Sequence, residues 1–214
     1  MAVMKIDEFA SKWFEVMNIS KQQKKKRMEI AEELADIVLF FLEEYLYSTA
    51  QDIPTTYLLT YLQDEIIKVV DKYSVNDTYT NLYIVKVVQD IYDVTVAHKD
   101  EKFFTSRERA FLIAVNEANS IANYTELTDA KQKGYLFKTW CTEQDDRVRP
   151  THVPMEGVTI PIDAYFEFPT CQGLFPRDII NMTAEETCNC RCWLVFEKGK
   201  DDDSQTTSGN IENE

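Results

Sequence analysis

The chain has 214 residues, of which 44% are hydrophobic and 12% aromatic, so it can bury the core of one large domain or of two small ones. Its formal net charge is −14, which argues against a protein that binds DNA mainly by neutralising phosphates. All six prolines lie at or after Pro54, and only five glycines occur. The first half therefore lacks the turn residues that an all-β fold needs.

Apolar residues recur at helical spacing through the first hundred positions. The predicted helices cover about 6–17, 28–45, 58–73 and 82–91. Pro54 separates the second from the third, and Asn76 or Asp77 is the expected cap of the fourth. Such apolar stripes are typical of a packed core, so we expect a helical region over residues 1–104.

A compact basic cluster runs from Lys21 to Arg27. Its simplest interpretation is the solvated, positive start of a helix. The alternative is a contact for DNA or for an acidic partner.

Nothing at the N-terminus resembles a signal peptide, because charged residues such as Lys5 and Asp7 interrupt any apolar segment. The longest apolar stretch, 37–42, is far too short to span a bilayer, so we expect no membrane partner. The five cysteines are then expected to be reduced thiols or metal ligands rather than a disulfide framework.

A further helix is expected to begin near Thr105, because Thr105 and Glu108 have the spacing of a capping box, and to end at or before Gly134. β-branched and aromatic residues then predict strands over 135–141, 158–162 and 190–196. The expected fold is α+β, with a helical N-terminal region followed by a long helix and a small β-containing domain. Residues 198–214 are acidic and polar, and we expect a disordered tail.

Three strings in the C-terminal half carry most of the information: W-C-T-E-Q-D-D-R-V-R-P-T-H-V-P-M-E-G, F-P-T-C-Q-G-L-F-P and N-C-R-C-W. In this order they resemble the phage Mu protein F-like, or phage head morphogenesis, family of minor head proteins. The resemblance covers residues 105–197, including Arg109, Ala114, Glu117 and Asn123 in the preceding helix. The motif residues are Trp140, Asp145, Arg147, Arg149, His152, Gly157, Asn189, Cys190, Arg191 and Cys192.

The resemblance implies a minor head protein of a bacteriophage or prophage that acts in head morphogenesis and in DNA packaging or ejection. It would lie in the virion, inside the head, after assembly in the host cytoplasm. The implied partners are the portal protein, a scaffold or major capsid protein and the packaged double-stranded DNA. Residues 1–104 lie outside the resemblance, and from their position we expect them to supply the segment that docks on portal or scaffold.

The motif side chains suit a structural network. Each arginine can donate several hydrogen bonds, and Asp145 can accept them in pairs. We expect Asp145 to pair with one arginine and His152 to bond a backbone carbonyl, so that the loops are held around a small β core.

Zinc is the alternative, with His152, Cys171, Cys188, Cys190 and Cys192 as candidate ligands. On an extended strand the thiols of Cys188, Cys190 and Cys192 face one side, but they span about 13 Å. At most two of them could share an ion with His152 or Cys171. We therefore expect no cofactor.

The sequence contains no glycine-rich phosphate loop, no G-x-S-x-G and no H-E-x-x-H. The acidic pair Glu185 and Glu186 is interpreted as solvated. We expect that the protein is not an enzyme. Two alternatives are a toxin or transferase delivered with the virion and a metal-stabilised DNA-binding module.

Overall fold

Helices make up the N-terminal part of the chain and short strands the C-terminal part, so the fold is α+β as predicted. The computed structural model describes residues 5–199. The helices are α1 (Ile6–Glu15), α2 (Lys21–Ala50), α3 (Tyr57–Tyr73), α4 (Thr78–Ala97), α5 (Arg107–Gln132) and α6 (Ala184–Thr187), with 3-10 turns η1 (Lys102–Thr105) and η2 (Val153–Met155). The strands are β1 (Phe137–Cys141), β2 (Thr159–Pro161), β3 (Phe166–Glu167), β4 (Gln172–Gly173) and β5 (Trp193–Glu197).

The four helices predicted from periodicity are confirmed as α1 to α4. Helix α2 begins earlier than its apolar stripe, because the Ser20 side chain accepts from the backbone of Gln23 in a capping box. Asp77 caps α4 in the same way, with Thr80 as its partner. None of the helices in residues 5–199 combines the length and the apolar character needed to cross a membrane.

Helix α5 begins near Thr105 as predicted, but the predicted Thr105–Glu108 capping box is wrong. Thr105 lies in the turn η1, and the cap is the next hydroxyl, Ser106, whose Oγ accepts from the Arg109 N–H at 3.2 Å. The reason is the extended backbone of Ser106, the conformation that an N-cap requires. At the other end Gly134 ends the helix as predicted, in the left-handed conformation with φ +73°.

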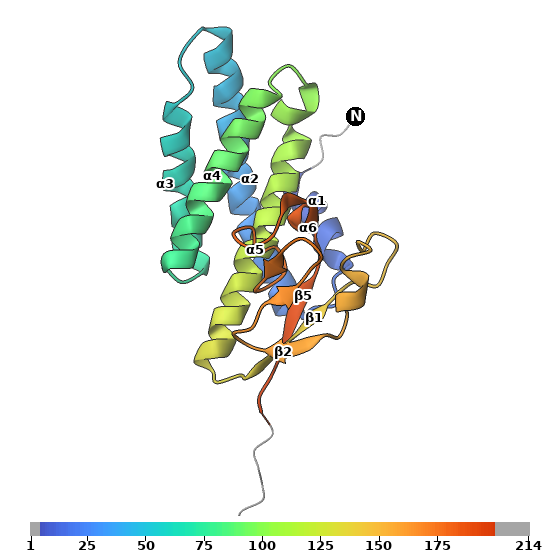
Figure 1. The fold of residues 1–214 in the computed structure, drawn as a ribbon. Coiled ribbons are helices and arrows are strands. Elements are labelled where there is room, and N and C mark those ends of the chain that lie inside the picture. Colours follow the sequence, from blue (N-terminus) through green and yellow to red (C-terminus); the bar gives the residue numbers. More distant parts are fainter. Residues whose placement is uncertain (1–4, 200–214) are drawn as a thin grey trace, which may run out of the picture.

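Helix α5 connects the two parts of the molecule (Figure 1). The contact between α5 and α2 is more extensive than that between any other two elements. The first two thirds of α5, through Ala122, contribute to a core shared with α1 to α4. Its last part contributes Tyr124, Leu127 and Ala130 to a second core formed with the strands. Because α5 is buried on most sides, it lacks the single apolar stripe of a surface helix.

The main sheet has the antiparallel order β2-β1-β5, and β3 pairs with β4 in a separate ribbon. In the register, Trp140 lies opposite Leu194, and both side chains are buried. The three predicted strands are confirmed as β1, β2 and β5. The last one starts later than predicted, because β5 begins at Trp193 and leaves residues 189–192 in a loop.

The predicted domain boundary near residue 105 stays a prediction. Helix α5 follows this boundary in the chain and shares a core with the helices that precede it. Of the predicted tail, residues 200–214 lie outside the described residues.

Lys138 occupies an inward position of β1, where the alternation of the strand would place an apolar residue. Its Nζ donates to the carbonyl of Leu174 at 2.6 Å. Burial lowers the pKa of this amine from 10.5 to about 7.

We therefore expect Lys138 to make the stability depend on pH. Between about pH 7 and 10 the unfolded chain binds a proton at Lys138 that the folded chain does not, so this residue's contribution to stability rises with pH. The slope is at most about 1.4 kcal/mol per pH unit. Urea denaturation of the wild type and Lys138→Met at several pH values tests this. A difference between the two proteins that stays constant from pH 7 to 10 contradicts it.

Candidate functional site

The motif residues form one cluster. Four of them make up the loop of residues 189–192, which lies between α6 and β5, and the others lie around it. Trp140 is in β1, and Asp145, Arg147 and Arg149 follow it in a loop. His152 directly precedes η2, and Gly157 leads into β2. The structure thus brings residues 38 to 46 positions apart into one cluster.

Asp145 and Arg191 form an ion pair that joins these two segments. Arg191 Nη2 donates to both carboxylate oxygens of Asp145, at 2.8 Å each. Burial by itself would raise the pKa of Asp145, but the hydrogen bond and charge of Arg191 outweigh it and lower the pKa. Arg147 stays mostly exposed, with its Nε 3.6 Å from the same carboxylate. Arg149 instead donates to the carbonyl of Cys188.

Trp140 and Gly157 pack beneath the cluster and fix the adjoining turn. The indole of Trp140 is fully buried and packs edge-on against His152, with ring centroids 5.4 Å apart, and against Phe166. The Gly157 N–H donates to the Trp140 carbonyl at 2.9 Å, and φ of Gly157 is +75°. A residue with a Cβ would strain this turn.

His152 is buried, and its partners differ from the expected backbone carbonyl. Its Nδ1 lies 3.7 Å from Cys190 Sγ and 3.5 Å from Cys192 Sγ. Its Nε2 lies 3.0 Å from Glu186 Oε2, although the approach is not in line for a straight hydrogen bond. The interpretation of Glu186 as solvated is therefore wrong. The single turn of α6 points Glu186 inward, where it also accepts from Thr151, and leaves Glu185 exposed.

The five candidate metal ligands separate in space. The Sγ atoms of Cys190 and Cys192 lie with His152, whereas Cys188 is exposed and Cys171 belongs to the segment around β4. The assumption of one extended strand through all three cysteines is wrong, because α6 ends at Thr187 and Asn189 has φ +56°. The neighbouring thiol of Cys192 and the ring of His152 hold the pKa of Cys190 well below its ordinary value. The pKa of Cys192 is raised by the adjacent Cys190.

Three asparagines of α5 bond the loop backbone. Asn119 donates to the carbonyl of Cys190 at 3.1 Å, and Asn123 donates to that of Cys192 at 3.2 Å. Asn116 Oδ1 accepts from the Asn189 N–H at 2.8 Å. Because residues 189–192 lie outside any strand, these amides satisfy backbone groups that would otherwise lack partners.

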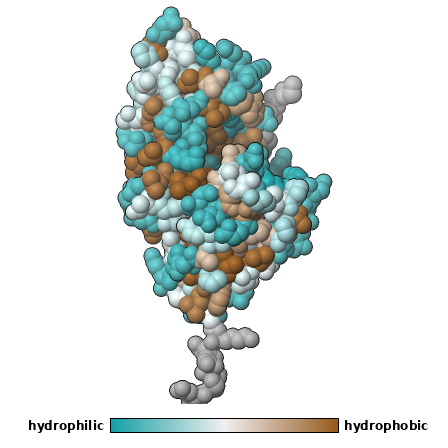
Figure 2. Space-filling view, in the orientation of Figure 1, coloured by the Kyte–Doolittle hydropathy of each residue, from teal (hydrophilic) through white to brown (hydrophobic). Residues whose placement is uncertain are grey.

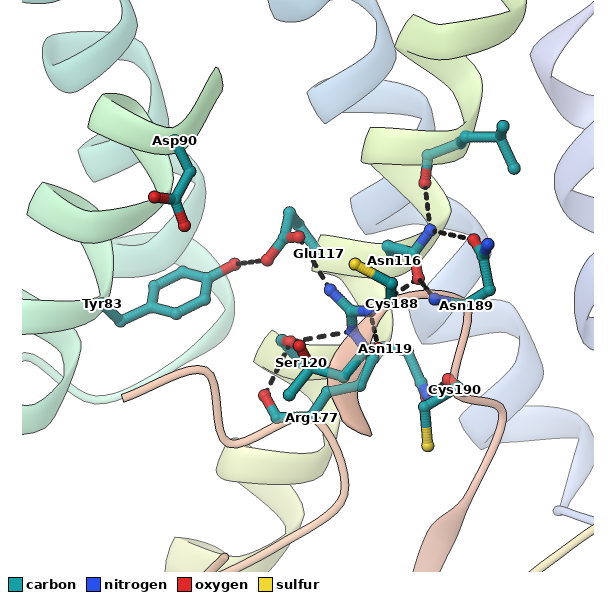
Figure 3. Close-up of polar contacts among 12 residues, drawn as sticks. Tyr83, Asp90, Asn116, Glu117, Asn119, Ser120, Arg177, Cys188, Asn189 and Cys190 are labelled. Atoms are coloured by element: carbon teal, nitrogen blue, oxygen red, sulfur yellow. Dashed lines mark hydrogen bonds and ion pairs between the residues drawn. The ribbon is translucent and has the colours of Figure 1, made fainter. Parts of the chain in front are cut away.

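Arg177 is the centre of a second network, drawn in Figure 3, that the sequence analysis missed. It is buried in the left-handed conformation with φ +66°. Its guanidinium donates to Asn116 at 2.6 Å, Glu117 at 2.8 Å and Ser120 at 3.1 Å. Tyr83 of α4 donates to the other oxygen of Glu117 at 2.9 Å. Burial raises the pKa of Tyr83 well above its ordinary value, so its hydroxyl remains a donor.

Arg27 is the centre of a third network. The interpretation of the basic cluster as a solvated helix start is therefore wrong for this residue. Arg27 is fully buried between α2 and α5, and it pairs with Glu126 at 2.6 Å. It also donates to Asn119 at 2.9 Å and to Asn123 at 2.8 Å. In the sequence, the signal that could have revealed these networks was the spacing of Asn116, Asn119 and Asn123, which places three amides along one helix face.

One protein family matches this chain. A family model described as Phage Mu protein F like protein matches residues 83–195, more than half of the sequence. The match begins within α4 and includes Arg177, Glu186 and all the motif residues. No curated protein and no solved structure gives a significant match.

Replacing Arg27 by methionine should lower the free energy of unfolding by about 3–5 kcal/mol, because Glu126 and two amide oxygens lose a buried partner. Lys25→Met is the matched control, since the Lys25 side chain is 78% exposed, and should change stability by less than about 0.5 kcal/mol. Chemical denaturation measures both values. Equal effects of the two substitutions would show that Arg27 is not a structural anchor.

Arg177→Lys keeps the charge but loses the planar set of donors. We expect it to destabilise the protein by about 2 kcal/mol or more, because Asn116, Glu117 and Ser120 cannot all be bonded by one ammonium group. The same change at Arg147, whose side chain is 66% exposed, should have an effect below about 0.5 kcal/mol. Thermal and urea denaturation of both variants test the difference, and an unchanged stability of Arg177→Lys refutes it.

Proposed function

The chain belongs to the Phage Mu protein F-like family of phage head morphogenesis proteins, and on that basis we propose that it is a minor head protein of a bacteriophage or prophage. In this proposal it enters the assembling head in the host cytoplasm, binds the portal protein and a scaffold or major capsid protein, and stays in the virion interior. There it acts on the packaged DNA during packaging or ejection. The family match over residues 83–195 is the observation that carries the proposal.

The use of the motif side chains supports a structural role over a catalytic one. Asp145 is paired with Arg191, and the amides of Asn119 and Asn123 are bonded to the loop backbone. Side chains engaged in this way hold loops in place, as a component of an assembly requires. We propose on these grounds that the protein is not an enzyme.

The helical half offers the surface for portal or scaffold contact. Large apolar side chains are exposed on it, among them Tyr47 on α2, Tyr57 on α3, and Leu82 and Val85 on α4. Hydrophobic residues lie between hydrophilic ones over this part of the molecule (Figure 2). Leu82 and Val85 are three residues apart, so they lie on the same face of α4, with exposed fractions of 53% and 59%.

The two alternatives have less support. A DNA-binding module would need the basic cluster free, but Arg27 is committed to Glu126, and the net charge is −14. A delivered toxin or transferase predicts that changing Arg147 or His152 abolishes an activity without unfolding the protein.

Co-purification with portal protein and procapsids tests the proposal. We expect the full-length protein in procapsids and in mature heads, in few copies per particle. Its absence from both would refute the role.

We expect Val85→Asp to reduce incorporation at least tenfold while leaving the stability unchanged, because a charge on an exposed face disrupts an apolar contact but not the fold. Val153→Asp is the matched control, since it makes the same change at a valine of the same exposed fraction, 59%, in η2, outside the helical half, and should be incorporated normally. Quantitative immunoblotting of purified particles measures both. Equal incorporation of the two variants would exclude this face as the docking surface.

A further inference from the structure

His152, Cys190 and Cys192 place three potential metal ligands around one point. Their ligand atoms all lie within 4.8 Å of one another, and all three residues are buried. They come from two segments, one before η2 and one before β5, which are nearly 40 residues apart in the sequence. The set is one that the zinc alternative from the sequence allowed, two of the cysteines with His152.

The hydrogen-bonding capacity of His152 Nδ1 does not account for both sulfurs. A ring nitrogen either donates one hydrogen or accepts one, so His152 Nδ1 can bond only one of the two sulfurs near it. Both sulfurs nevertheless lie at similar distances from Nδ1, 3.7 Å and 3.5 Å. A cation between the three atoms would satisfy all of them together.

The two nitrogen–sulfur distances fit tetrahedral zinc. With Zn–S near 2.3 Å and Zn–N near 2.05 Å, a tetrahedral angle separates nitrogen from sulfur by about 3.6 Å. The two observed separations lie on either side of this value. Two thiolates and a neutral imidazole also balance the charge of Zn²⁺, which removes the cost of burying isolated charges.

Glu186 lies near the ring nitrogen of His152 that would not bind the metal, although not in line for a straight hydrogen bond. Its Oε2 lies 3.0 Å from His152 Nε2, on the side of the ring opposite the thiols. Carboxylates in this position orient the ring and fix the tautomer whose other nitrogen binds the metal. Thr151 donates to the same oxygen at 2.7 Å and holds the carboxylate in place.

A fourth coordination position is open beside the three ligands. A small cavity of about 10 Å³, bordered by Arg149, Arg191 and the three ligands, has room for about one water molecule. We propose that His152 Nδ1, Cys190 Sγ and Cys192 Sγ bind one Zn²⁺ ion, with water as the fourth ligand, and that the ion ties the loop before β5 to the loop after β1. The sequence spacing favoured no cofactor, with zinc as the alternative. The geometry of the cluster favours zinc.

Metal analysis of the full-length protein, purified under reducing conditions, tests this proposal. We expect one equivalent of zinc in the wild type. After chelation, titration with Co²⁺ should give the visible bands of a tetrahedral ion and a thiolate charge-transfer band in the near ultraviolet. The Co²⁺ titration needs no substitution, so it decides the matter even if the ligand variants do not fold.

Variants then locate the site. Cys190→Ser, Cys192→Ser and His152→Ala should lose the bound zinc, whereas Cys171→Ser and Cys188→Ser should keep it, because these two cysteines lie outside the cluster. Glu186→Gln should retain one equivalent with an affinity about 10–100-fold lower. A wild type that carries no zinc and gives no cobalt spectrum overturns the proposal. So does full zinc retention in Cys190→Ser, or loss of zinc in Cys188→Ser.

Discussion

The constraint on which the structure depends is the burial of irregular chain against α5. The segment from Leu174 to Cys192 contains little regular structure, so many of its backbone groups have no partner in a strand or helix. The asparagines of α5 provide those partners. Arg27 donates to the oxygens of Asn119 and Asn123 and thereby turns their nitrogens towards the loop carbonyls. Removing Arg27 would leave the asparagine oxygens without a donor, and removing the asparagines would leave the loop carbonyls without one.

This arrangement couples the helical half to the family domain. Arg27 lies in α2, outside the matched residues 83–195, yet it orients the amides that hold the cysteine loop. Tyr83, the first matched residue, connects α4 to Arg177 through Glu117. The N-terminal helices and the motif loops are thus joined by a continuous set of hydrogen-bonded side chains.

The cysteine loop itself is held from two sides. The α5 amides bond its carbonyls, while its side chains turn the other way, towards His152 and Asp145. Among these side chains, Cys190 and Cys192 lie next to His152, whereas Arg191 binds Asp145. One short segment thus connects the helical bundle, the loop after β1 and the sheet.

The sequence alone determined the α+β fold, the helices, the three strands of the main sheet and the family, because periodicity, caps and motif order are local properties. Only the tertiary structure decided which charged residues are buried. Arg27, Arg177 and Glu186 look like ordinary surface residues in sequence, and Arg27 and Arg177 are buried against partners 60–99 positions away. It also separated Cys188 and Cys171 from His152. Burial of a charge depends on a partner supplied by another element, and no local pattern encodes that meeting.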